Sequence, residues 1–174
     1  MGSSLVENIC PIIKAVKELT PKTILDYGMG YGKYGFLLRE YLDIINDRLS
    51  KKEWQVTIDG IDAFSSYLSP AQGYIYNSIS VFSDFIEGKK YDVVLFIDVI
   101  EHMEKWRGKI LLDKLLKICK WLIISTPSAW SPEFSINPYD THRELWSIED
   151  FKEYEYEKII DTVGIVLRIK GKME

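Results

Sequence analysis

The sequence predicts a single α/β domain with a doubly wound, mostly parallel sheet and a C-terminal antiparallel hairpin. Expected strands and helices alternate along the chain, which is typical of a parallel sheet covered by helices on both faces. The segment YDVVLFI at residues 91–97 is almost continuously apolar, as in a strand buried on both faces. The 174 residues correspond to one ordinary domain that is long enough to bury a sizeable core.

The first half of the chain alternates between apolar patterns of helical period and short apolar runs. Asn8 and Pro11 suit the start of the first helix, and Thr20-Pro21 suits its end. Residues 63–78 are rich in aromatic and turn residues and define no clear element. The expected elements are a helix over 11–19, a strand over 22–26, a helix over 33–49, a strand over 54–61 that ends at Asp62, and a short strand over 79–82.

The second half continues this alternation and then changes to antiparallel strands. Ser147 is expected to begin a short helix, with Glu149 and Asp150 in its first turn. The expected elements are a strand over 91–97, a helix over 101–120, a strand over 121–125, a long loop over 128–146, and a hairpin of 157–162 and 165–170 around Gly164. The single domain then consists of an N-terminal helix (1–20), a core (22–127), a loop (128–146), and a C-terminal helix and hairpin (147–174).

Composition and charge argue against several classes of protein. With 22 basic and 26 acidic residues the net charge is -4, so non-specific nucleic-acid binding, which needs a basic face, is not favoured. No apolar run approaches the roughly 20 residues of a membrane span. Cys10 and Cys119 lie far apart and outside any CxxC pair, so we expect two buried thiols in a reducing cytoplasm.

Unusual residues collect where the expected strands end, and a glycine loop is the clearest example. The segment DYGMGYGKYG at residues 26–35 lies between a strand and a helix. Glycines let the backbone turn tightly and let a ligand approach it, and the first N–H groups of the helix are free to bind that ligand. Tyr34 stands where a phosphate-binding P-loop needs Ser or Thr after Lys33, which excludes that motif. A dinucleotide site would need a second half that a chain of this length does not comfortably supply.

These segments resemble the class I S-adenosylmethionine-dependent methyltransferases over residues 22–127. The match consists of DYGMGYG as the first motif, IDGID at the end of the second strand, Ser-Asp-Phe after the third strand, and YDVVLFIDVIEH as the fourth motif. The resemblance implies a Rossmann-like sheet, to which the final antiparallel hairpin also belongs, and S-adenosylmethionine as the cofactor.

The resemblance also implies which residues bind the cofactor. The glycine loop would approach the methionyl part, with Asp26 near its ammonium group. Asp62 would accept both ribose hydroxyls, and Asp59 is an alternative acid that lies inside the strand. The remaining contacts are expected from Gly28, Gly30 and Gly32 of the loop, Ile61 and Ala63 beside the adenosine, Asp84 at the adenine amino group, Phe85 against its ring, and Asp98 at the end of the fourth strand.

A second constellation predicts either a metal site or local helix contacts. Asp98, Glu101 and His102 would share one face if the helix began near Asp98, and His142 lies in a loop that returns over the same cleft. Such a mixed set of oxygen and nitrogen ligands suits a divalent transition metal or manganese. The pattern resembles the E-x-x-E-H motif of small-RNA 2′-O-methyltransferases and ubiquinone-pathway O-methyltransferases, with Asp98 in place of the first Glu. In the alternative interpretation Glu101 caps the helix and His102 packs locally, without metal.

The resemblance therefore predicts an enzyme that transfers a methyl group to a small-molecule acceptor, through oxygen. His142, His102 and Asp98 are the candidate catalytic residues, since a hydroxyl acceptor benefits from a base or a metal. Three alternatives stay open: a metal-dependent RNA methyltransferase, a non-catalytic cofactor-binding regulatory subunit, and a nicotinamide oxidoreductase. The loop over 128–146 is expected to recognise the acceptor or to pack as a small core, through Trp130, Phe134, Tyr139, Trp146 and the cation Arg143. The sequence defines no oligomeric state.

Overall fold

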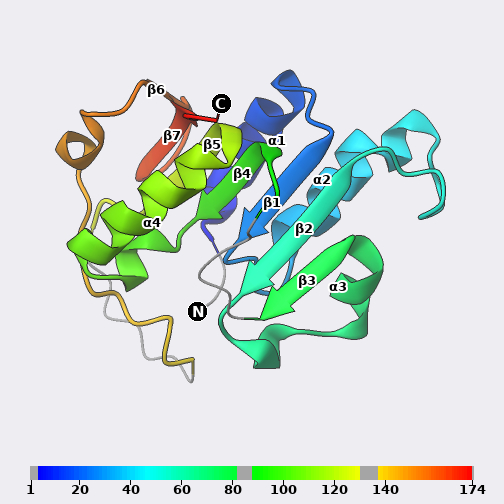
Figure 1. Ribbon diagram of the computed structural model, residues 1–174, viewed down its shortest axis with the longest axis horizontal. Helices are drawn as coiled ribbons and strands as arrows, with labels where there is room; N and C mark the ends of the chain where they lie inside the picture. Colours follow the sequence, from blue (N-terminus) through cyan, green and yellow to red (C-terminus); the bar gives the residue numbers. More distant parts are fainter. Residues whose placement is uncertain (1–3, 82–87, 130–136, 174) are drawn as a thin grey trace.

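The structure, a computed structural model, describes residues 4–81, 88–129 and 137–173, and these form one α/β unit. Its sheet of seven strands has the order β3-β2-β1-β4-β5-β7-β6 (Figure 1). β1 to β5 pair in parallel, whereas β7 pairs antiparallel with both β5 and β6. The strands are β1 (Thr23–Tyr27), β2 (Thr57–Asp62), β3 (Ser78–Val81), β4 (Tyr91–Ile97), β5 (Cys119–Thr126), β6 (Tyr156–Lys158) and β7 (Ile165–Lys170).

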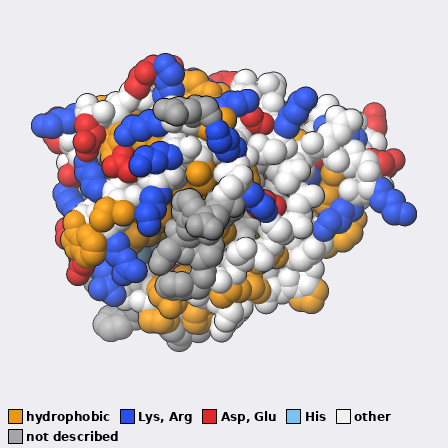
Figure 2. All heavy atoms as spheres, viewed as in Figure 1, with side chains coloured by type: hydrophobic (Ala, Val, Ile, Leu, Met, Phe, Trp, Pro, Cys, Tyr) orange, Lys and Arg blue, Asp and Glu red, His pale blue; other side chains and the backbone are white. Residues whose placement is uncertain are grey.

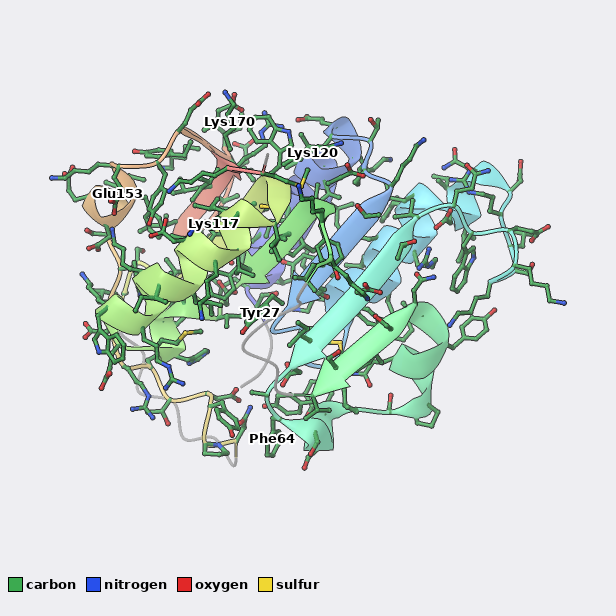
Figure 3. All side chains as sticks on the ribbon, in the orientation of Figure 1. Tyr27, Phe64, Lys117, Lys120, Glu153 and Lys170 are labelled. Carbon is green, nitrogen blue, oxygen red and sulfur yellow. The ribbon has the colours of Figure 1, made fainter. Side chains whose placement is uncertain are left out.

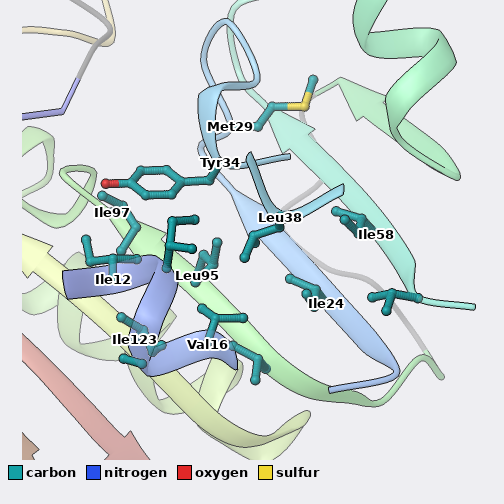
Figure 4. Packing of buried hydrophobic residues seen from close by; sticks show 14 of the residues in the cluster. Ile12, Val16, Ile24, Met29, Tyr34, Leu38, Ile58, Leu95, Ile97 and Ile123 are labelled. Atoms are coloured by element: carbon teal, nitrogen blue, oxygen red, sulfur yellow. The ribbon is translucent and has the colours of Figure 1, made fainter. Parts of the chain in front are cut away.

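Helices cover both faces of this sheet, as the alternation of elements predicts. Alternate residues of β4 explain how: Val93 and Leu95 belong to a core beneath α1 and α2, while Val94 and Phe96 belong to a core beneath α4. Figure 4 shows the first core, in which Ile12 and Val16 of α1 and Leu38 of α2 pack against residues of the sheet. The helices are α1 (Ile9–Glu18), α2 (Lys33–Leu42), α3 (Pro70–Ile75) and α4 (Lys105–Lys117), with short 3₁₀ turns η1 (Val6–Asn8), η2 (Ile44–Asn46), η3 (Ser65–Tyr67), η4 (Ile100–His102) and η5 (Ile148–Phe151).

Different residues lie at the two ends of the strands. Tyr27 and Phe64 lie where β1 and β2 end, and Lys120 and Lys170 lie at the opposite end of the sheet (Figure 3). The parallel strands therefore direct their carboxyl ends, and the loops that follow them, to one side of the molecule. Ligands of doubly wound sheets bind at that side.

Two of the predicted helices have different limits in the structure. The helix expected over 33–49 ends at Leu42, because the buried carboxylate of Asp43 accepts hydrogen bonds from Arg39, Arg48 and the backbone N–H of Gln55. The helix expected to begin at residue 101 begins only at Lys105, after η4.

The structure adds one helix that the sequence did not define and corrects one prediction. Residues 63–78, which define no clear element in the sequence, contain α3, whose start has a capping box formed by Ser69 and Gln72. Cys119 is buried as predicted, but Cys10 is exposed, because it lies on the outer face of α1. Within the described ranges we find no helix whose length and apolar character would suffice to cross a bilayer.

Candidate active site

A cavity of about 720 Å³ opens at the carboxyl ends of β1, β2 and β4. Its volume lies within the roughly 300–1,000 Å³ typical of small-molecule sites. Most of the predicted site residues line it: Asp26, Gly28, Gly30, Asp62, Ala63, Asp98, Glu101, His102 and His142. Gly32 borders the loop without lining the cavity, and Asp84 and Phe85 lie outside the described residues.

The glycine loop between β1 and α2 has a backbone that side chains would disrupt. Gly28, Gly30 and Gly32 have φ values of 81°, 54° and 84°, in the left-handed region that favours glycine. A Cβ atom at Gly28 would lie 2.3 Å from Cγ2 of Val99, the residue after Asp98. The loop is thereby close-packed against the end of β4, and its backbone faces the cavity.

Asp62 at the end of β2 holds this loop in place. One carboxylate oxygen accepts a hydrogen bond from the N–H of Gly30 at 2.7 Å, and the other accepts from the N–H of Phe64 at 2.8 Å. Burial raises the pKa of Asp62, and these two backbone hydrogen bonds oppose that rise. Each oxygen keeps a second acceptor position, which a pair of hydroxyl groups could use.

Asp59, the alternative acid of β2, has a different environment. Its carboxylate accepts from the Lys89 ammonium at 2.8 Å and from the Tyr91 hydroxyl at 2.9 Å. These contacts lower its pKa against the effect of burial. Asp59 does not line the cavity, so among the two acids of β2 it is Asp62 that faces it.

Asp26 at the end of β1 is almost fully buried beside Tyr76. The Tyr76 hydroxyl donates to the Asp26 carboxylate at 2.6 Å. Burial raises the pKa of Asp26 to about 6, and the hydrogen bond from Tyr76 only partly opposes this. The carboxyl group is therefore easy to protonate, and a cation brought into the cavity would favour its charged form.

Sequence reasoning missed the support that α3 gives to the glycine loop. Tyr76 directly follows α3, and Gln72 within α3 donates its side-chain N–H to the carbonyl of Gly30 at 3.0 Å. The available signal was the run Ser69-Pro70-Ala71-Gln72, which combines a capping box with a proline in the first turn.

Glu101, His102 and His142 form a cluster at the ends of β4 and β5. One ligand atom from each of the three lies within 4.8 Å of the others, and Glu101 is 2% exposed. The backbone carbonyl of Glu101 accepts from the N–H of Arg143 at 2.8 Å and of Glu144 at 3.2 Å. These bonds hold the loop of His142 against η4, so that two segments far apart in sequence meet at the cavity.

Asp98 lies beside this cluster but not within it. The predicted helix face of Asp98, Glu101 and His102 does not form, because Asp98 adopts a left-handed backbone with φ 51° and α4 begins later. The Ser125 hydroxyl donates to the Asp98 carboxylate at 2.5 Å. Burial raises the pKa of Asp98, which this hydrogen bond and the nearby Lys33 ammonium oppose.

Some residues of the loop after β5 line the cavity, and others pack elsewhere. Tyr139 and Arg143 are exposed and line it, and Asp140 accepts a hydrogen bond from the Tyr67 hydroxyl at 2.7 Å. Trp146 is 1% exposed and packs in the core beside Phe151, so for this residue the packing alternative is confirmed. Trp130 and Phe134 lie outside the described residues.

The strand order with antiparallel β7 beside β5, the glycine loop after β1 and the acid at the end of β2 define the class I S-adenosylmethionine-dependent methyltransferases. The family model described as "Methyltransferase domain" matches residues 5–162, and the chain belongs to this family. It is thus an enzyme of the S-adenosylmethionine-dependent methyltransferase class, as the sequence motifs predict. No curated protein matches the chain.

Solved structures share the fold at low sequence identity. The magnesium protoporphyrin IX methyltransferase of Synechocystis with bound S-adenosylmethionine is 14% identical, with a TM-score of 0.59 over 97% of this chain and 78% of its own. The methyltransferase domain of a bacterial protein, CtHen1-C, is 17% identical, with a TM-score of 0.61 over 97% of this chain and 98% of its own. An O-methyltransferase family protein from Burkholderia thailandensis is 14% identical, with a TM-score of 0.63 over 95% of this chain, which spans 56% of that protein's length.

Proposed function

We propose that this enzyme transfers the methyl group of S-adenosylmethionine to an oxygen atom of a small-molecule acceptor. The observation that supports it most directly is the convergence of Glu101, His102 and His142 on the cavity that the glycine loop borders. Two imidazoles and a carboxylate can accept a proton from a hydroxyl group or hold a metal beside it.

The residues of the cavity fit the cofactor group by group. Asp62 would accept the two ribose hydroxyls through the remaining acceptor positions of its oxygens. Asp26 would contact the ammonium of the methionyl part, whose charge suits a buried carboxylate. Gly28, Gly30 and Ala63 would contact the cofactor through the backbone, and Gly32 would shape the turn.

The reaction is an in-line displacement at the methyl carbon. The acceptor oxygen forms a bond to that carbon, the carbon–sulfur bond breaks, and sulfur keeps the electron pair as S-adenosylhomocysteine forms. The acceptor hydroxyl must lose its proton, and we assign this proton to His142, with His102 as its neighbour. Asp98 would border the reacting groups from the end of β4. The chain therefore supplies orientation, exclusion of water and a base.

The three-residue cluster also fits a divalent metal by its donor set of one carboxylate and two imidazoles. Glu101, His102 and His142 would hold it, with Asp98 nearby as a further oxygen donor, and His142 would then act as a ligand in place of its role as the base. Such an ion, when bound, would lower the pKa of an acceptor hydroxyl.

The proposal is tested by calorimetry with S-adenosylhomocysteine, followed by a radiolabelled methyl-transfer screen over metabolite pools. We expect binding of S-adenosylhomocysteine, no binding of NAD, and transfer to a small molecule whose product resists mild base as an ether does. Binding without transfer to any pool would overturn the proposed small-molecule acceptor. Transfer to total RNA alone would overturn the small acceptor.

A further inference from the structure

The outer end of the cavity combines exposed apolar side chains with cations. Trp106 is 63% exposed and Ile110 is 50% exposed, and both line the cavity one helical turn apart on α4. Arg107 and Lys114 of the same helix and Arg143 of the loop after β5 line it as well. In Figure 2, Lys and Arg side chains surround a hydrophobic patch at the left of the view, over α4.

Two other cations of α4, Lys105 and Lys109, are paired with acids. Lys105 contacts the Asp150 carboxylate at 3.0 Å, and Lys109 contacts Glu153. Within the described ranges, by contrast, Arg107, Lys114 and Arg143 form no ion pair with an acid. Their charges border an apolar surface and are free to face a ligand, and guanidinium groups suit planar oxyanions well.

Acids at this outer end are few among the described residues that line the cavity. Glu104 is the acid there, and it accepts a hydrogen bond from the Trp106 ring N–H at 2.9 Å. Beside the glycine loop acids predominate instead: Asp26, Asp62, Asp98 and Asp140 line the cavity there, with Lys33 as the cation beside Asp98. The charge of the cavity thus reverses along its length, from acidic at the loop to basic at α4.

We propose that the acceptor is a compact planar anion, an inference that rests on the proposed function. Its apolar ring lies against Trp106 and Ile110, and its negative group, a carboxylate, sulfonate or phosphate, faces Arg107, Lys114 and Arg143. The acidic end of the cavity receives the cationic cofactor. Because the two ligands carry opposite charges, the site distinguishes them by position, and each strengthens the binding of the other.

The test uses two fluorescent probes that share one aromatic body. Anilinonaphthalene sulfonate is anionic, and N-phenyl-1-naphthylamine lacks the sulfonate. We expect the wild type to bind the anion about tenfold more tightly, with an affinity that falls as salt is added. The double variant Arg107→Gln/Lys114→Gln should bind the anion about tenfold more weakly and the neutral probe equally well. Trp106→Ala should weaken both probes.

Matched controls separate charge at this site from charge in general. The control variant Lys14→Gln/Lys117→Gln removes two exposed cations that do not line the cavity. Lys117 lies at the last turn of α4 (Figure 3). This variant should leave the affinities for the anionic and the neutral probe unchanged. The variant Arg107→Lys/Lys114→Gln keeps a positive charge at position 107. It should recover part of the anion affinity that the double variant Arg107→Gln/Lys114→Gln loses. Thermal unfolding of each variant verifies that it is folded, and S-adenosylhomocysteine binding is measured in the same samples.

The outcomes distinguish this inference from the proposed function. A wild type that fails to bind S-adenosylhomocysteine overturns both. Normal S-adenosylhomocysteine binding with equal anion affinity in wild type and double variant overturns the anionic acceptor alone, as does equal binding of the two probes. A single-stranded oligoribonucleotide that displaces the anionic probe at lower concentration than a mononucleotide does would replace the compact acceptor by nucleic acid.

Discussion

The rings of His102 and His142 lie with their centroids 5.0 Å apart, although they follow different strands of the sheet. The backbone of Arg143 and Glu144 holds the second histidine there by donating to the carbonyl of Glu101. The pair therefore depends on main-chain contacts that a change of side chain leaves in place. This makes the cluster suitable for substitution experiments.

Removal of the His142 imidazole should abolish proton acceptance while leaving the cofactor end of the cavity intact. We expect His142→Ala to lower the rate of methyl transfer about 100-fold or more, the usual contribution of a positioned base. Its affinity for S-adenosylhomocysteine should stay within about twofold of wild type. The control is Thr141→Ala, at the exposed neighbouring residue. A fully active His142→Ala enzyme would contradict the role of this histidine.

Metal binding by the cluster is testable without an acceptor. Cobalt(II) is expected to produce visible absorption bands on binding to the wild type, and these should disappear in Glu101→Gln and in His102→Ala. Chelation should lower the transfer rate, and manganese should restore it. An unchanged rate after chelation, together with absent cobalt bands, would rule out the metal and leave His142 as the base.

The two aspartates of β2 provide an internal comparison. Asp62→Asn should weaken S-adenosylhomocysteine binding about 10- to 100-fold, since charged hydrogen bonds are worth about 1.5–3 kcal/mol. Asp59→Asn should leave this affinity unchanged, because Asp59 contacts Lys89 and Tyr91 outside the cavity. Equal losses in the two variants would show that the affinity depends on the stability of β2 and not on a ribose contact.

The pKa of Asp26 gives a prediction with a defined sign. Burial raises it to about 6 from the ordinary value of 3.8, so the folded state disfavours the charged form. Its contribution to stability is therefore complete below about pH 4 and is lost as the pH rises to about 6. Asp26→Asn should be more stable than wild type by about 3 kcal/mol at about pH 7.5, with no difference near pH 4.

Denaturant unfolding at several pH values measures this difference. The same variant should bind S-adenosylhomocysteine more weakly, and binding to the wild type should weaken below about pH 6, where Asp26 must first lose its proton. A stability difference that is constant over this pH range would contradict the raised pKa.

Two glycines should respond in opposite directions to substitution by alanine. A Cβ atom at Gly35 would lie 2.2 Å from the ring of Tyr76, so Gly35→Ala should destabilise the fold by about 1–3 kcal/mol and displace the partner of Asp26. Gly73 lies in α3 with no atom within 4 Å of such a Cβ, so Gly73→Ala should stabilise by about 0.5–1 kcal/mol. Thermal melts suffice, and a neutral Gly35→Ala would argue against close packing around Tyr76.

The sequence predicted the features that depend on local pattern. The strand Tyr91–Ile97 was predicted to the residue, because a strand buried on both faces has a continuous apolar run. The glycine loop was predicted because its backbone needs left-handed residues, which leave a visible spacing. Its support by Tyr76 could not be predicted in this way, since the hydrogen bond to Asp26 joins residues that meet only through packing of α3.

The start of α4 shows the same limit. Periodicity favoured a helix that included Glu101, but the left-handed backbone of Asp98 and the 3₁₀ turn that follows delay it to Lys105. Glu101, His102 and His142 nevertheless lie together, because the segments after β4 and β5 follow neighbouring parallel strands. Both segments therefore begin at the same end of the sheet. Proximity of the residues was thus predictable from topology, whereas their local geometry was not.

The backbone of Asp98 has a consequence for engineering this enzyme. A backbone φ of 51° lowers the stability of the fold when the residue has a side chain, but not when it is glycine. Asparagine tolerates this conformation better than most residues. Asp98→Gly and Asp98→Asn are thus the substitutions with which a thermostabilisation campaign would begin. Both would remove the carboxylate beside the proposed reacting groups, so a selection for heat resistance alone would favour less active variants, and one that also required turnover would retain the aspartate.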